Sequence, residues 1–157
     1  MRLTGWRIAD PAFASTPEAM LSGEGAFLYG GRWNSKGVRV VYLGTSLAQA
    51  ALELLVHLRR PDILRQYAKL EVSFDAALVT HIDLNDLPDN WNSPQLASAV
   101  RNVGDNWVKD EISLVMQVPS AAIHGEYNYL LNPAHPDISK IRVGAITQFD
   151  YDPRLTL

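Results

Sequence analysis

The segment of residues 47–58 is the part of this sequence whose local structure is most constrained. It reads LAQAALELLVHL, a run of Leu, Ala and Val with few interruptions, and predicts an α-helix. Ser46 followed three residues later by Gln49 is a capping-box pattern at the expected start, and Pro61 lies just beyond the expected end. The helix is therefore delimited by the sequence on both sides.

A strand is expected directly before this helix. Residues 38–43, VRVVYL, are rich in β-branched side chains and follow the turn-rich sequence GGRWNSKG at 30–37. Alternation along a strand would place Val38, Val40 and Tyr42 on one face. Strand and helix together form one expected structural unit.

The expected helix carries a narrow polar stripe. Its only polar residues before the C-terminal arginine pair are Gln49, Glu53 and His57, spaced four apart and so on one face. The remaining residues are apolar, so we expect the helix to be largely buried. The stripe then has two interpretations: a thin solvent-exposed edge, which the spacing alone favours, or a cleft floor at Glu53 toward which Tyr42 and Arg32 could converge.

The rest of the chain predicts mainly strands. The expected strands are 68–74, 77–83, 112–120, 126–132 and 146–152. Ser93-Pro94 predicts the start of another helix, which we expect to end at Gly104. Runs of strands with a few helices between them indicate an α+β fold.

Composition restricts the classes of function. A chain of 157 residues with 47% hydrophobic content suits one compact domain over residues 1–157. A net charge of −3 means that the chain has no excess of basic residues to bind phosphates, so we expect no direct binding to nucleic acid. The chain has no Cys and its four His show no ligand spacing, so we propose no metal site. No apolar stretch suits a signal peptide or a membrane span, so we expect a cytoplasmic protein without a membrane partner.

Each of the other candidate residues, taken alone, could also have a purely structural role. Arg32 follows Gly31 in a loop whose glycines permit close backbone approach and whose guanidinium suits phosphate, but the loop matches neither a Walker motif nor G-x-G-x-x-G. Tyr42 alone suits a half-buried strand aromatic, and Ser120 alone suits a residue at a strand end. No G-x-S-x-G elbow supports a serine hydrolase.

The order and spacing of several motifs resemble the RES-domain family, which is named after an Arg, a Glu and a Ser. The matching motifs extend over nearly the whole chain: Gly5-Trp6-Arg7, SGEGA (22–26), GGRWNSKG (30–37), Val41-Tyr42, Ala51-Leu52-Glu53, Val118-Pro119-Ser120, NYLLNP (128–133) with His135-Pro136, Phe149-Asp150 and DPRL (152–155).

The resemblance implies a fold and a biological setting. The implied fold is ADP-ribosyltransferase-like, with small antiparallel sheets framing an NAD cleft and flanking helices. The implied role is the toxin of a type II toxin–antitoxin system, which degrades NAD by hydrolysis or phosphorolysis and arrests growth. NAD is then a substrate and no cofactor is implied. The implied partners are a cognate Xre-type helix-turn-helix antitoxin and a second copy of the chain, as a homodimer within a larger complex.

The resemblance also implies the site residues. The matched catalytic positions are Arg32, Tyr42, Glu53 and Ser120. The matched substrate-binding positions are Arg7, Gly31 and Asn128.

Elementary chemistry agrees with the roles of four of these residues. The carboxylate of Glu53 suits the oxocarbenium-like state of N-glycosidic cleavage. The guanidinium of Arg32 suits a pyrophosphate, with Arg7 as a second contact, and the ring of Tyr42 suits the cationic nicotinamide.

Two other functions remain open at this stage. Mono-ADP-ribosylation of a protein target would use the same pocket and differ only in what attacks the ribose. The sequence also leaves open whether water or phosphate attacks the ribose in NAD degradation. A non-catalytic corepressor within an antitoxin complex belongs to a different class, and a carboxylate placed in an apolar helix argues against it.

Overall fold

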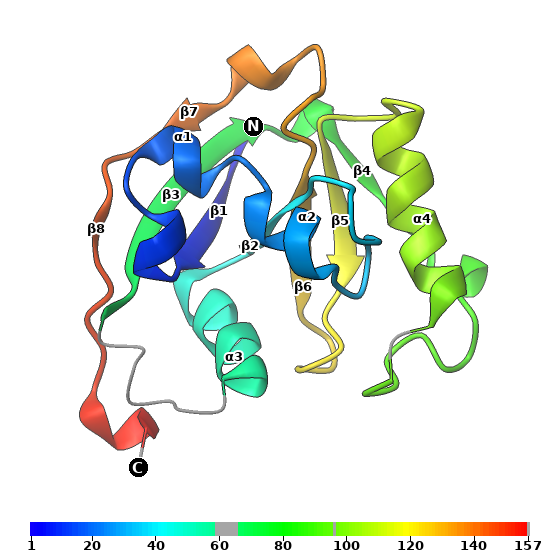
Figure 1. The fold of residues 1–157 in the computed structure, drawn as a ribbon. Helices are drawn as coiled ribbons and strands as arrows, with labels where there is room; N and C mark the ends of the chain where they lie inside the picture. The colour runs from blue at the N-terminus through cyan, green and yellow to red at the C-terminus, as the bar shows by residue number, and fades with distance from the viewer. Residues whose placement is uncertain (59–65, 96, 157) are drawn as a thin grey trace.

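The computed structural model describes residues 1–58, 66–95 and 97–156, and these residues confirm the α+β class (Figure 1). The strands are β1 (Arg2–Ala9), β2 (Val41–Gly44), β3 (Ala68–Asp75), β4 (Val79–His81), β5 (Val115–Pro119), β6 (Tyr127–Leu131), β7 (Arg142–Val143) and β8 (Thr147–Gln148). They form one sheet in the order β4-β5-β6-β2-β1-β3-β7, and β8 also pairs with β3. Among the strand pairs of the described residues, only β4–β5 is parallel.

The sheet consists of two halves that meet at a single residue pair. β1 and β2 share one bridge, between Trp6 and Gly44, whereas β1 pairs with β3 along its whole length. The other half joins β2, β6 and β5 in antiparallel register. These halves agree with the small antiparallel sheets that the resemblance implied.

Four α-helices and several short 3-10 turns accompany this sheet in the described part of the chain. The α-helices are α1 (Pro17–Met20), α2 (Glu24–Tyr29), α3 (Leu47–His57) and α4 (Ser98–Lys109). Short 3-10 turns occur at η1 (Pro11–Phe13), η3 (Ala76–Leu78), η4 (Leu84–Asp86), η5 (Ile138–Lys140) and η6 (Pro153–Thr156). Figure 1 shows α4 beside β4 and β5, with α1 and α2 in front of the sheet. Within the described residues, no helix is long and apolar enough to cross a membrane.

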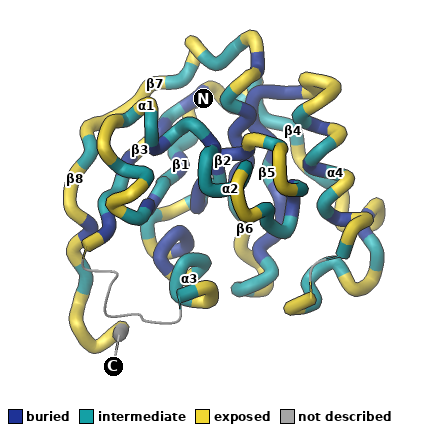
Figure 2. Tube along the Cα trace, in the orientation of Figure 1, coloured by how far each residue is buried: buried dark blue, intermediate teal, exposed yellow. Residues whose placement is uncertain are grey.

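Buried side chains hold the two halves of the sheet together. Figure 2 shows burial concentrated in the central strands. One apolar cluster includes Leu70, Val72 and Phe74 of β3 together with Tyr129 and Leu131 of β6. The rings of Phe74 and Tyr129 meet edge to face, with centroids 5.1 Å apart. A shared core therefore compensates for the single bridge between β1 and β2.

The expected helix after β2 is confirmed as α3. The Ser46 side chain accepts a hydrogen bond from the Gln49 backbone N–H at 3.0 Å, as a capping residue should. The reciprocal half of the capping box is absent, because the Gln49 amide bonds to side chains elsewhere. Pro61, expected beyond the helix, lies outside the described residues.

The expectation that α3 is largely buried is wrong. Its buried residues are Gln49, Ala50 and Ala51, whereas Leu52 is 40% exposed and Val56 is 64% exposed. Along the polar stripe Gln49 is buried, Glu53 is half-buried and His57 is exposed, while part of the apolar surface faces outward. Of the two interpretations of the stripe, the solvent-exposed edge therefore holds only at its C-terminal residue, His57.

The second expected helix also differs from expectation. It begins at Ser98 and continues through Gly104 to Lys109. A Cβ at Gly104 would lie 1.6 Å from the Trp33 backbone oxygen. Gly104 is thus a point of close packing inside the helix and does not end it.

Some expected strands are shorter in the structure. β2 begins at Val41, because Val38 bonds to Ser35 and Asn34 in a local turn. The expected strand 146–152 is reduced to Thr147–Gln148. β5 and β6 lie within their expected ranges, and the region expected as 77–83 contains η3 followed by β4. The sequence did not predict β1.

Candidate active site

A cavity of about 470 Å³ opens where the two halves of the sheet meet. Residues of β1, α2, β2 and α3 line it, together with the loop at 30–33 and the segments around Pro119 and Asn128. Its volume is within the range of small-molecule and cofactor sites.

The carboxylate of Glu53 lines this cleft and is held through one of its oxygens. Glu53 Oε1 accepts hydrogen bonds from Ser120 Oγ at 2.5 Å, Asn128 Nδ2 at 2.7 Å and Gln49 Nε2 at 3.2 Å. Within the described part of the chain, Oε2 accepts no hydrogen bond. The carboxylate is therefore oriented by three donors while one oxygen is available to a ligand.

Sheet register brings these donors together. Asn128 on β6 pairs with Gly44 at the end of β2, and α3 starts shortly after Gly44. A Cβ at Gly44 would lie 2.5 Å from the Ala50 backbone nitrogen, so glycine allows α3 to pack against the strand end. Ser120 directly follows β5, the other neighbour of β6. Three separate segments therefore converge on Glu53.

Arg32 lines the same cleft but makes no hydrogen bond or ion pair with Glu53. Its Nη1 donates to two backbone oxygens of the loop beyond η4, those of Trp91 at 2.8 Å and Ser93 at 2.9 Å. Within the described residues, Nη2 and Nε have no partner and are available to an anion. Burial lowers the pKa of the Arg32 guanidinium from its ordinary value, and the negative charge of Glu53 opposes that shift.

The Tyr42 hydroxyl is turned toward the loop that carries Arg32. It donates to Asn34 Oδ1 at 2.6 Å and accepts from the Trp33 backbone N–H at 3.1 Å. Burial raises the pKa of Tyr42, so the phenol stays neutral. A Cβ at Gly31 would lie 2.7 Å from this hydroxyl, which explains the glycine. Tyr42 can therefore offer a ligand its ring, while its hydroxyl is committed to the loop.

Helix α4 holds that loop in place. The carboxylate of Asp105 accepts from the Ser35 backbone N–H at 2.8 Å and from Ser35 Oγ at 2.6 Å. At the preceding residue of α4, the backbone of Trp33 packs against Gly104. These two contacts fix the part of the loop that directly follows Arg32.

Arg7 lies on β1, where it lines the cleft. Its Nε donates to the Met20 backbone oxygen at 3.2 Å, which fixes the direction of the side chain. Burial lowers the pKa of this guanidinium from its ordinary value. Two arginines, Arg7 and Arg32, thus line one cavity.

Comparison with known proteins identifies the family. The sequence model of the RES domain matches residues 4–152. The chain belongs to the RES domain family. It is 35% identical over 140 residues to "Toxin Res" of Photorhabdus laumondii, covering 88% of this chain and 89% of that protein. It is 36% identical over 159 residues to "Prs ADP-ribosylating toxin" of Sphingobium sp., covering 99% and 98% respectively.

A solved structure supports the fold of this RES domain. A chain from the crystal structure of the M. tuberculosis MbcT–MbcA toxin–antitoxin complex matches with a TM-score of 0.70 and 18% sequence identity. The match covers 99% of this chain and 87% of that one. At this identity the similarity establishes a common fold.

The RES-domain site combines expected and unexpected residues. Glu53, Ser120 and Asn128 are in direct contact, and Arg32, Tyr42, Gly31 and Arg7 line the same cavity. Sequence reasoning missed Gln49 as a partner of Glu53, although their spacing of four on one helix could have indicated it. It also missed Asn34 and Asp105, for which no local pattern in the sequence stands out.

Proposed function

We propose that this RES-family chain is the toxin of a toxin–antitoxin pair and that it cleaves the bond between nicotinamide and ribose in NAD. The observation that carries the proposal is the Glu53 carboxylate, held at Oε1 by three donors with Oε2 free inside the cleft. Cleavage of an N-glycosidic bond places positive charge on the ribose, and a fixed carboxylate stabilises that charge. Oε2 is the atom that would accept a ribose hydroxyl.

The other residues of the cleft suit the rest of the substrate. Arg32 has Nη2 and Nε available for the pyrophosphate, and Arg7 offers a second cationic contact. The ring of Tyr42 suits the flat cationic nicotinamide before it leaves. Ser120 and Asn128 orient Glu53 rather than attack the substrate, since both already donate to Oε1.

The bond changes are simple. The C1′–N bond breaks with its electron pair passing to nicotinamide, which departs neutral and needs no strong general acid. An oxygen of water or phosphate then bonds to C1′. Hydrolysis yields ADP-ribose and a proton, and phosphorolysis yields phosphorylated ADP-ribose.

Transfer of ADP-ribose to a protein is the second candidate. One relative that matches nearly the whole chain is named for ADP-ribosylation of Prs, and such a transfer would use the same cleft. In that case a protein side chain would attack C1′ in place of water or phosphate.

The test is incubation of the purified chain with NAD in the absence of any acceptor protein. Release of nicotinamide over many turnovers, with ADP-ribose or its phosphorylated form as second product, supports NAD degradation. Omitting phosphate from the buffer separates hydrolysis from phosphorolysis. Little release until a protein acceptor is added, with label from NAD appearing on that acceptor, would replace this proposal with the transferase.

The proposal includes a cellular setting. We propose that the chain acts in the cytoplasm, forms a homodimer within a larger complex and is neutralised by an Xre-type antitoxin that covers the cleft. Expression alone should lower cellular NAD before growth slows, and co-expression with the antitoxin should restore both. Growth arrest at an unchanged cellular NAD level would contradict the proposal that NAD degradation causes the arrest.

A further inference from the structure

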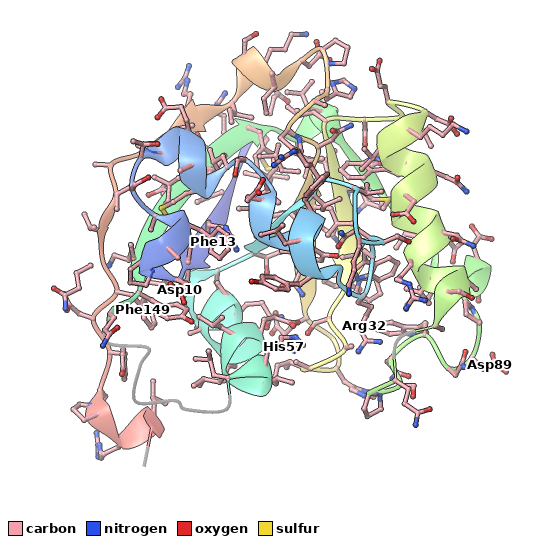
Figure 3. All side chains as sticks on the ribbon, in the orientation of Figure 1. Asp10, Phe13, Arg32, His57, Asp89 and Phe149 are labelled. Atoms are coloured by element: carbon pink, nitrogen blue, oxygen red, sulfur yellow. The ribbon has the colours of Figure 1, made fainter. Side chains whose placement is uncertain are left out.

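The cleft has a second end that the proposed reaction does not use. Asp10, Phe13 and Tyr67 line the cavity with Arg7. Figure 3 shows Asp10 and Phe13 on one side of α3 and Arg32 on the other. The cavity therefore extends well beyond the surroundings of Glu53.

Strand β1 sets the length of this extension. Trp6 pairs with Gly44, which pairs with Asn128, the partner of Glu53, so these residues mark the row of the sheet nearest the reacting centre. Asp10 lies four residues further along the chain, roughly 13 Å at the rise of an extended strand. A diphosphate linking two riboses spans a distance of that order. Arg7 directly follows Trp6 and therefore lies between this row and Asp10 along the chain.

The Asp10 carboxylate has unused acceptor capacity. Oδ1 caps η1 by accepting from the Ala12 backbone N–H at 2.8 Å. Of the residues that the structure describes, only Tyr67 donates to Oδ2, through its hydroxyl at 3.3 Å, near the long limit of a hydrogen bond. Within the described residues, no cationic side chain forms an ion pair with Asp10. Capping needs one oxygen, so the second remains available to a ligand in the cleft.

The neighbours of Asp10 suit a nucleoside. Tyr67 is 6% exposed, and burial together with the nearby charge of Asp10 raises its pKa, so the hydroxyl remains a proton donor. Phe13 is half-buried, lines the cavity and offers an aromatic ring on which a base can stack. The cationic Arg7 suits a phosphate, the carboxylate of Asp10 suits a ribose, and the ring of Phe13 suits a base.

We propose that Asp10 binds the hydroxyls of the adenosine ribose and makes the cleft selective for NAD over NADP. A carboxylate accepts hydrogen bonds from a 2′-hydroxyl but repels a 2′-phosphate, and dinucleotide-binding proteins of another fold use an acidic residue in this way. This inference rests on the proposed function, because it concerns the same cleft and substrate.

The test compares kcat/KM for NAD and NADP in the wild type, Asp10→Asn and Asp10→Ser. Both replacements can still cap η1, so two independent variants guard against a failure to fold. We expect the wild type to prefer NAD by at least about 100-fold, the order of a like-charge contact at a partly solvated site. Each variant should reduce that preference about tenfold or more, chiefly through a higher kcat/KM for NADP.

Asp83→Asn is the matched control. Asp83 caps η4 as Asp10 caps η1, by accepting from the Asn85 backbone N–H at 2.9 Å, and it does not line the cleft. Its replacement should leave the NAD to NADP ratio unchanged. Equal use of the two substrates by the wild type, or an unchanged ratio in both Asp10 variants, overturns the inference while NAD cleavage stands.

A binding measurement keeps this test independent of the reaction. Calorimetry compares ADP-ribose with its 2′-phosphorylated form on the wild type and the Asp10 variants. Selective binding that depends on Asp10, in a protein that does not cleave NAD, would support the inference and refute the proposed reaction. Binding of neither ligand would refute the inference.

Discussion

Glu53 and Arg32 line one cleft, but the fold holds them by different means. Glu53 lies on a helix, and three side-chain donors from three segments fix its carboxylate. Arg32 lies on a loop, and the backbone oxygens of Trp91 and Ser93 fix its guanidinium. Side-chain identity thus controls the first group, whereas backbone geometry controls the second. Mutations around Glu53 and around Arg32 should therefore fail in different ways.

The largest effect is expected from Glu53→Gln. The amide has the same shape but no negative charge for the oxocarbenium-like state, so kcat for nicotinamide release should fall by about 10²–10³ or more. Circular dichroism should show an intact fold. Glu18→Gln, at an exposed position on α1, should keep full activity. A folded Glu53→Gln protein with near wild-type turnover would remove this carboxylate from the reaction.

Gly104→Ala should damage the Arg32 end through the backbone. The added Cβ would lie 1.6 Å from the Trp33 oxygen, so α4 and the loop must separate. We expect a loss of about 1–3 kcal/mol in the free energy of unfolding, although alanine normally favours a helix. Denaturant titration measures it. Gly25→Ala in α2, where a Cβ would meet nothing within 4 Å, is the control and should not destabilise. A stable Gly104→Ala protein would contradict the loop anchoring.

Arg32→Lys tests the forked geometry at constant charge. An ammonium cannot donate to both backbone oxygens and also present a planar edge to phosphate, so kcat/KM for NAD should fall about 10–100-fold. The same change at Arg142, exposed on β7, should have no effect. Activity equal to that of the parent protein would mean that Arg32 contributes only its positive charge and not its forked geometry.

The smallest effects come from a pair of serines, one at each end. Ser120→Ala removes one of three donors to the Glu53 carboxylate and should lower kcat about tenfold with little change in KM. Ser35→Ala should lower it less than about threefold, because the Ser35 backbone N–H still bonds to Asp105. Steady-state kinetics of both variants decide this. The reverse order would mean that the loop controls the reacting centre.

Features that depend on neighbours along the chain could be predicted from the sequence alone. The capped helix α3 and the shared face of Gln49, Glu53 and His57 follow from apolar periodicity, side-chain capping and helical spacing. The order of the RES motifs identified the family and the residues around the cleft. Each of these features can be read within a few residues or from a linear pattern.

Features that depend on contacts between distant segments could be established only from the folded chain. Gln49 and Glu53 of α3 turn inward because Asn128 and Ser120 meet them there, and a periodic pattern cannot tell which face has partners. Gly104 lies inside a helix because the Trp33 backbone needs its space, whereas locally a glycine indicates an end. Backbone atoms that fix Arg32 leave no trace in side-chain types, and Asp10 becomes a candidate ligand contact only because the sheet extends the cleft to it.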